Sequence, residues 1–304
     1  MKKIPDTMHF QGCEFYKNHI FEEGSIVPVY NVHNFNGLNQ IVGYSKFINP
    51  EKKILYRGEC KLHNSMRPSI NHTIKSQVAR DKANKRINNI IDRALTDERF
   101  CQFSKLSPEC PVDKYVIEAI MQHYGINTHC IDAVDNHWIA LWFGQNKFVK
   151  SRSTNKYCRY VPRIKEMFDY IGFNSLKEEE LYQYIVLLAA DYAECSRGIT
   201  VSNDLISIDL RTALPSNFLR PHAQHGWILR KKAHEPTDTY DLSDSVIGIL
   251  RIRIDNAKRW LGDGVLLSIE NLFPSPIFDQ GYEVLLSRDD LFDDGTNKIA
   301  RYVY

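Results

Sequence analysis

The chain has 304 residues, of which 43% are hydrophobic and 25% are charged. This composition is typical of a globular protein and excludes a disordered or a fibrous one. The formal net charge is only +2, from 39 basic and 37 acidic residues. Any basic surface for a nucleic acid must therefore be local.

Targeting signals and membrane segments are not predicted. The first residues are polar, and no apolar run approaches the ~18 residues that cross a membrane. The seven cysteines are scattered and form no CxxC pair, which favours reduced thiols over a disulfide framework or a zinc site. We therefore expect a cytoplasmic protein that has no membrane partner.

In chain order, residues 1–35 are polar and aromatic with weak periodicity, and we expect an N-terminal extension with short strands. Residues 53–58 predict a strand that ends at Gly58. A long helix is predicted from Ile74 to Phe100, because apolar residues recur there at helical spacing. Its stripe consists of Ile87, Ile90, Ile91 and Leu95.

The middle of the chain predicts three more helices. The first runs from Val112 to Tyr124 and is followed by Gly125 as a C-cap; after a short strand at 130–132, Asn136 caps a second helix over 137–143. A basic loop over 144–176 precedes the third helix, residues 176–193, whose first turn carries three glutamates.

The last third of the chain predicts strands. Residues 205–210, 226–230 and 246–254 are alternating or β-branched runs bounded by Pro, Asn and Asp. Helices early and strands late indicate an α+β fold with helices packed on a mostly antiparallel sheet.

Several motifs of well-known enzyme classes are missing. The sequence has no GxxxxGK[ST] loop, no GxGxxG, no HExxH and no GxSxG. P-loop ATP hydrolysis, Rossmann redox chemistry, zincin proteolysis and α/β-hydrolase chemistry therefore lose their usual support.

Three polar clusters remain as candidate sites. In the first, Tyr56-Arg57-Gly58-Glu59, a strand-end arginine can bind a phosphate and a glycine permits close approach of a ligand. The alternative is an ordinary ion pair between Arg57 and Glu59.

The second cluster surrounds a predicted helix end. It contains Gln122, His123, Tyr124, His129 and Asp132. The helix dipole would favour a protonated His123. The alternative is a structural C-cap whose side chains satisfy carbonyls.

The third cluster leads into a predicted strand and contains Arg220, His222, Gln224 and His225. A neutral amide such as Gln224 is cheaper to bury beside a ligand than a carboxylate. His222 and His225 together with His123 or His129 resemble a set of metal ligands. No acidic residue stands beside His222 and His225 in the sequence, so we expect no bound metal. The basic residues that follow are either a solvated face or, with the exposed face of the 74–100 helix, a nucleic-acid patch. They are Arg230, Lys231, Lys232, Arg251, Arg253, Lys258 and Arg259.

Taken together, the clusters resemble the FRG domain, a family associated with bacteria and phages and named for a Phe-Arg-Gly motif. That motif stands here as Tyr56-Arg57-Gly58. The blocks Arg67-Pro68-Ser69, Gln122 to Ala133 and Ala140 to Gly144 are similar to further family blocks. So are Arg220 to Trp227 and Glu270 to Pro274. The resemblance implies an N-terminal extension over 1–39, an FRG domain over 40–280 and a C-terminal segment over 281–304 that packs on the same domain.

The pattern of an early-strand arginine and a polar late-strand motif is similar to ADP-ribosyltransferases. That resemblance implies an ADP-ribosyltransferase-like fold and NAD as co-substrate without a metal. It also implies a toxin or phage-defence setting with an antitoxin partner. The acceptor would be a macromolecule, with RNA or single-stranded nucleic acid slightly favoured over protein.

The same resemblance implies roles for individual residues. Catalytic roles fall to His123, Tyr124, Gln224 and Glu59, with Glu283 on an expected C-terminal strand as a second late carboxylate. Cofactor-binding roles fall to Tyr56, Arg57, Gly58, Ser69, Gln122 and Arg220. Substrate-binding roles fall to His129, Asp132, His222 and His225. The rival functions are a non-catalytic module that binds a nucleotide or a phage component, and a metal-free ribonuclease that uses His123 with His222 or His225.

Overall fold

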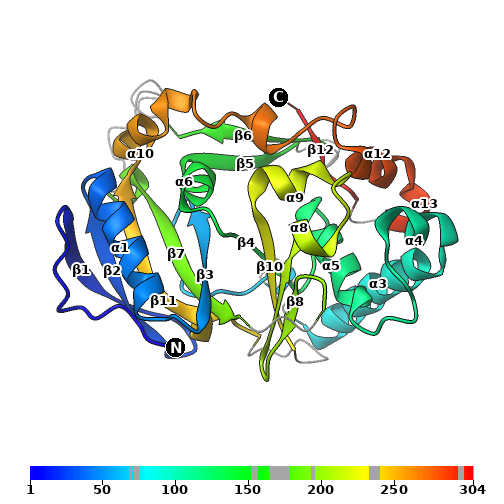
Figure 1. Ribbon diagram of the computed structural model, residues 1–304, viewed down its shortest axis with the longest axis horizontal. Helices are drawn as coiled ribbons and strands as arrows, with labels where there is room; N and C mark the ends of the chain where they lie inside the picture. Colours follow the sequence, from blue (N-terminus) through cyan, green and yellow to red (C-terminus); the bar gives the residue numbers. More distant parts are fainter. Residues whose placement is uncertain are drawn as a thin grey trace.

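The computed structural model describes residues 1–68, 70–71, 76–151, 157–163, 178–192, 196–232, 240–293 and 298–303. These residues form a mixed α+β fold around a nine-stranded sheet with the order β1-β2-β11-β7-β3-β4-β10-β9-β8 (Figure 1). Its strand pairs are antiparallel except for the parallel pair β2–β11. The expected fold class is therefore confirmed at the level of a mostly antiparallel sheet covered by helices.

The strands of the large sheet are β1 (Cys13–Ile20), β2 (Ile26–Val32), β3 (Lys52–Glu59), β4 (Ile131–Val134), β7 (Tyr182–Asp191), β8 (Ile199–Val201), β9 (Leu205–Asp209), β10 (Gly226–Lys231) and β11 (Val246–Arg253). A three-stranded sheet with the order β12-β6-β5 consists of β5 (Asn146–Lys150), β6 (Tyr157–Pro162) and β12 (Arg301–Tyr302). The small sheet and the C-terminus lie beyond one end of the large sheet, near α6 and α9 (Figure 1).

The α-helices are α1 (Phe35–Phe47), α3 (Gln77–Thr96), α4 (Glu98–Ser104), α5 (Asp113–His123), α6 (His137–Gln145), α8 (Leu210–Ala213), α9 (Leu219–Gln224), α10 (Ile254–Trp260), α11 (Ile269–Leu272), α12 (Gln280–Ser287) and α13 (Asp289–Phe292). Short 3₁₀ helices are η1 (Glu178–Leu181), η2 (Ser243–Ser245) and η3 (Gly262–Gly264). None of these helices combines the length and the apolar composition that crossing a bilayer requires.

The core is divided by the two faces of the sheet. On β3, Tyr56 packs in a cluster with residues of α1 and α6, whereas Leu55 packs with Met66 and Tyr240 on the opposite face. This follows from the alternation of side chains along a strand. A third cluster joins α3, α5 and α8 to β9 and β10.

The predicted elements are confirmed in most of the chain. The strand expected at 53–58 is β3, and the helix expected at 74–100 becomes α3 and α4. Asp97 separates these two helices because its side chain accepts a 2.7 Å hydrogen bond from the backbone N–H of Phe100 and so caps α4.

The helix predicted over 176–193 is wrong. Its described part is the 3₁₀ helix η1 followed by β7, which is buried at every position from Gln183 to Ala190. A strand buried on both faces has no alternation of polar and apolar residues, so its sequence cannot be told from that of a buried helix. Residues 1–39, expected as an extension, contribute β1 and β2 to the large sheet.

Candidate functional site

A cavity of about 670 Å³ opens where β3 and β4 part, within the ~300–1,000 Å³ typical of ligand sites. These neighbouring strands share a single register pair, Tyr56 with Val134. On their other edges, β3 pairs with β7 and β4 pairs with β10 along their whole lengths. The cavity is lined by residues of β3, the end of α5, β4 and the small sheet, with Gln224 and Phe273 completing it.

Arg57 bridges the two strands at this junction. Its Nε lies 2.6 Å from a carboxylate oxygen of Glu59, and its Nη1 donates a 2.7 Å hydrogen bond to the backbone carbonyl of Asp132. Burial opposes its charge, but Glu59 and Asp132 outweigh that and raise the pKa of Arg57. The guanidinium of Arg57 thus links β3 to β4 where their backbones are not paired, and it stays charged on the cavity floor.

Gly58 lines the cavity and is also required by the close approach of a helix. A Cβ on Gly58 would lie 1.8 Å from the carbonyl oxygen of Ala140 and 2.8 Å from the backbone nitrogen of Gly144. Helix α6 therefore crosses directly over β3 at this position. The close approach expected from the sequence is present, but its partner is α6.

The helix-end cluster forms a second polar group on the cavity wall. The Nε2 of Gln122 donates a 2.7 Å hydrogen bond to Asp132, and the Thr128 hydroxyl donates a 2.8 Å bond to the Oε1 of Gln122. The Nδ1 of His123 lies 3.5 Å from the other carboxylate oxygen of Asp132. The Asp132 side chain is 42% exposed, so its carboxylate is held in place yet open to a ligand.

Aromatic rings from the small sheet and its surroundings form an aromatic wall of the same cavity. Tyr160 and Tyr302 are parallel, with ring centres 6.3 Å apart, and Phe273 lies 4.9 Å from Tyr160 and 4.6 Å from Tyr302. Phe143 and Phe148 also line the cavity. A cavity with both polar and aromatic lining can bind a molecule that has both a hydroxyl-rich part and a flat ring.

Arg220 lies behind this aromatic wall and not in the cavity. Its side chain is fully buried, and its guanidinium carbon lies 4.3–4.6 Å from the ring centres of Tyr124, Tyr282 and Tyr302. Its side-chain nitrogens have no hydrogen-bond partner among the described residues. The cation is held by aromatic faces, which differs from the expected contact with a cofactor.

Tyr124 belongs to the same cage. It is fully buried, and its hydroxyl donates a 3.0 Å hydrogen bond to Asp279, a buried carboxylate that also accepts from the backbone N–H of Arg220 and of Tyr282. Burial and Asp279 raise the pKa of Tyr124 well above its ordinary value. Its expected catalytic role therefore finds no support in its position, which is structural.

Two other expected contacts are placed at or near the cavity. Gln224 lines it, and its Nε2 donates a 2.7 Å hydrogen bond to the carbonyl of Leu272. Tyr56 lies at the cavity wall, but its side chain is fully buried with the ring edge-on to His137. Ser69, expected to bind the cofactor, lies outside the described residues.

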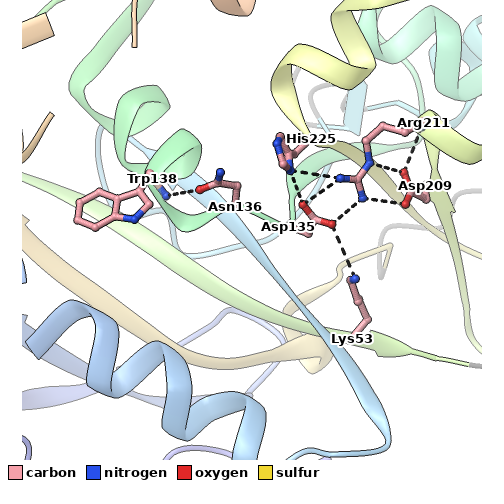
Figure 2. A network of polar contacts seen from close by, with 7 residues as sticks. All are labelled: Lys53, Asp135, Asn136, Trp138, Asp209, Arg211 and His225. Atoms are coloured by element: carbon pink, nitrogen blue, oxygen red, sulfur yellow. Dashed lines mark hydrogen bonds and ion pairs between the residues drawn. The ribbon is translucent and has the colours of Figure 1, made fainter. Parts of the chain in front are cut away.

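The remaining histidines lie elsewhere. The Nδ1 of His225 is 3.0 Å from Asp135 and 3.2 Å from Arg211, in a network that also holds Asp209 and Lys53 (Figure 2). Burial and the charge of Arg211 lower the pKa of His222. Neither histidine is among the residues lining the cavity.

His129 is buried beside Glu118 and Tyr240. Its backbone N–H donates a 3.2 Å hydrogen bond to Glu118, and its carbonyl accepts a 2.7 Å bond from the Tyr240 hydroxyl. Burial lowers the pKa of its imidazole. In the part of the chain that the structure describes, no three potential ligands lie close enough to hold a metal ion.

Two further expectations need correction. Glu283 lies in the first turn of α12 and not on a strand. Three arginines of the expected basic patch are paired with acidic residues: Arg230 with Glu118 at 2.9 Å, Arg251 with Glu178 at 3.1 Å and Arg253 with Asp255 at 3.0 Å. These ion pairs leave less free positive charge there than the sequence suggests.

Sequence reasoning missed the aromatic wall and the lysines beside it. Lys61, Lys147 and Lys150 line the cavity and are exposed. The run Lys147-Phe148-Val149-Lys150 does not alternate between polar and apolar residues, so the sequence predicts a basic loop over 144–176, whereas this segment contains β5 and β6. Nothing in the local sequence indicates that Tyr302 lines the cavity, because only the fold brings β12 beside β6.

Comparisons with known proteins bear on one part of the chain. The family model described as FRG domain matches residues 52–153. No curated protein and no solved structure gives a significant match to the chain. The matched segment supplies Arg57, Gly58, Gln122, His123 and Asp132. The chain thus carries a segment similar to the FRG domain family, and that segment builds the polar side of the cavity.

Proposed function

We propose that the protein is an NAD-dependent mono-ADP-ribosyltransferase that acts as a toxin or defence effector on a cellular macromolecule. One observation carries the proposal: charged, amide and imidazole groups from separate parts of the chain line one cavity together with several aromatic rings. The polar groups belong to Arg57, Glu59, Gln122, His123, Asp132 and Gln224. A dinucleotide needs both kinds of surface, since its bases stack and its riboses and phosphates form hydrogen bonds.

In the proposed reaction, the bond between the nicotinamide nitrogen and the ribose carbon breaks, and its electron pair leaves with neutral nicotinamide. The acceptor then forms a bond to the same carbon and loses its proton to a carboxylate. Glu59 suits both tasks, because it is held by Arg57 and can stabilise the positive charge that develops on the ribose. Arg57 would bind the pyrophosphate, and Gln224 would orient the nicotinamide ribose.

Nucleic acid remains the proposed acceptor over protein. Lys82, Lys85 and Arg86 are exposed on α3 and form a cationic helix face, which can attract a phosphate backbone. A toxin of this kind would require a neutralising antitoxin-like protein in the cell that produces it.

A non-catalytic nucleotide-binding module is the second candidate. It is favoured by the pairing of both acidic residues that line the cavity: Glu59 with Arg57 and Asp132 with Gln122. The ribonuclease is disfavoured, because His222 and His225 lie outside the cavity that contains His123.

The test is nicotinamide release from NAD, with and without cell extract, by the protein and by Glu59→Gln. We expect a loss of roughly 100-fold or more in Glu59→Gln, the usual scale for an acid–base group. The matched control is Asp255→Asn, because Asp255 pairs with Arg253 two residues away, as Glu59 does with Arg57, but outside the cavity. We expect this control to retain activity.

Two outcomes would overturn the proposal. If no nicotinamide is released with any extract while a nucleotide still binds, the protein is a binding module. If RNA is shortened without NAD, it is a nuclease. Transfer of labelled ADP-ribose to a protein instead of RNA would correct only the acceptor.

A further inference from the structure

Asp132 presents an acceptor-only surface to the cavity. Its carboxylate is 42% exposed, and it is oriented by the Gln122 amide at 2.7 Å and by the His123 imidazole at 3.5 Å. Thr128 fixes the amide of Gln122 in turn. A carboxylate has roughly four lone-pair positions, so two such partners leave room for more donors. The two hydroxyls of a vicinal diol are donors with the matching spacing.

The charges around Asp132 favour hydroxyls over a phosphate at this point. The carboxylate of Glu59 already pairs with Arg57, whose Nη1 donates to the backbone carbonyl of Asp132. A phosphate beside the Asp132 carboxylate would meet a like charge. The exposed ammonium groups of Lys61, Lys147 and Lys150 line the same cavity and, together with Arg57, suit a phosphate that lies away from Asp132.

The aromatic wall favours an uncharged base. Arg220 lies 4.6 Å from the ring centre of Tyr302 and 5.4 Å from that of Phe273, and both rings line the cavity. A buried cation draws electron density from these rings toward itself, so they attract a second cation less. A neutral purine therefore fits this wall better than the positively charged nicotinamide ring of NAD.

The aromatic wall and Asp132 border the same space. Tyr160, Tyr302 and Asp132 all line the cavity. A base against the rings would place its ribose toward the carboxylate.

We propose that Asp132 binds the 2′- and 3′-hydroxyls of an adenosine ribose and so selects ribonucleotides with a free 2′-hydroxyl. This inference rests on the proposed function and names the part of NAD that the aromatic wall and Asp132 would hold. It also makes Asp132 a specificity-determining residue, distinct from the carboxylate that acts on the acceptor.

The test uses calorimetric titration with three probes: AMP, 2′-deoxy-AMP and adenosine 2′,5′-bisphosphate. For the unaltered protein we expect 2′-deoxy-AMP to bind roughly 10- to 100-fold more weakly than AMP, the scale of a hydrogen bond to a charged group. The bisphosphate should also bind more weakly than AMP, because its 2′-phosphate meets the carboxylate.

In Asp132→Asn, the ratio of affinities should fall both for AMP over 2′-deoxy-AMP and for AMP over adenosine 2′,5′-bisphosphate. The preference for AMP over 2′-deoxy-AMP falls toward one because a neutral amide accepts more weakly, and the bisphosphate recovers because the repulsion is gone. The control Asp255→Asn, which lies outside the cavity, keeps both the affinity for AMP and the ratio of AMP to 2′-deoxy-AMP. Melting midpoints confirm that each variant is folded.

The outcomes separate this inference from the proposed function. Discrimination that depends on Asp132, without nicotinamide release from NAD, supports the inference and removes the transferase. Nicotinamide release together with equal binding of AMP and 2′-deoxy-AMP overturns the inference alone. An unchanged ratio in Asp132→Asn overturns it as well, and so does failure of all three probes to bind, whereas the transferase stands or falls on nicotinamide release.

Discussion

The three adjacent residues of the motif Tyr56-Arg57-Gly58 have three different structural roles. Tyr56 fills the core beneath α1 and α6, Arg57 joins two parting strands, and Gly58 admits the backbone of α6. Of the three side chains, only that of Arg57 is available to a ligand. A motif of this kind can therefore be required for the fold as well as for ligand binding or catalysis.

Gly58→Ala tests the packing role of the glycine. The new methyl group would meet the carbonyl of Ala140 at 1.8 Å, so α6 or β3 must shift, and we expect a loss of roughly 1–3 kcal/mol or more in the free energy of unfolding. Denaturant unfolding measures it. Gly43→Ala is the control, because no atom lies within 4 Å of the position and it is in helix α1. There the substitution should be neutral or stabilising. Equal stability of the two variants would show that α6 does not cross β3 this closely.

His137 makes stability depend on pH. Burial and the nearby Lys46 lower the pKa of His137 to about 4, from 6.5. Between pH 6.5 and 4 the unfolded chain therefore binds a proton that the folded chain does not, so this residue lowers stability as the pH falls. The loss in the free energy of unfolding is at most roughly 3 kcal/mol. We expect a smaller value because the side chain is partly exposed.

His137→Asn removes this titration. We expect the stability difference between the unaltered protein and the variant, measured by urea unfolding, to be constant above pH 6.5 and to move in favour of the variant toward pH 4. A difference that stays the same over the whole range would contradict the buried neutral imidazole.

At the scale of elements, β7 shows where sequence patterns fail. The run Gln183 to Ala190 is buried throughout, so it has neither the helical nor the alternating period. The three glutamates before it resemble a helix N-terminus, but they form only the turn η1. By contrast, α6 could be predicted because its cap is local: Asn136 accepts a 3.0 Å hydrogen bond from the N–H of Trp138.

The short strand β12 is a second element without a sequence signal. It pairs with β6, and Tyr302 contacts Arg220 behind the aromatic wall. Tyr302→Leu should cost about 2 kcal/mol of stability, since the desolvated cation loses one aromatic face, and should weaken binding of AMP. Tyr302→Phe keeps the ring and is the control. If the two variants have the same thermal stability and the same affinity for AMP, the Tyr302 ring neither stabilises Arg220 nor binds the base.

At the scale of the whole molecule, the sequence predicts most strands and helices but not how they meet. Nothing local in residues 26–32 indicates a parallel partner 220 residues away in β11, and nothing near Arg220 indicates that Tyr302 covers it. Arg57, Gln122, His123, Asp132 and Gln224 could be predicted as cavity residues, because each lies in a polar block beside an apolar one. Arg220 and Tyr124 could not be told apart from them, because their burial depends on Asp279 and α12.

NAD should bind in the cavity at the parting of β3 and β4. A crystal structure of Glu59→Gln grown with NAD shows where the dinucleotide lies, because this variant prevents turnover. We predict the adenine ring against Tyr302 and Phe273, its ribose hydroxyls at Asp132 and the pyrophosphate near Arg57. NAD bound at another surface, or a cavity that stays free of ligand at saturating NAD, would overturn the proposed function.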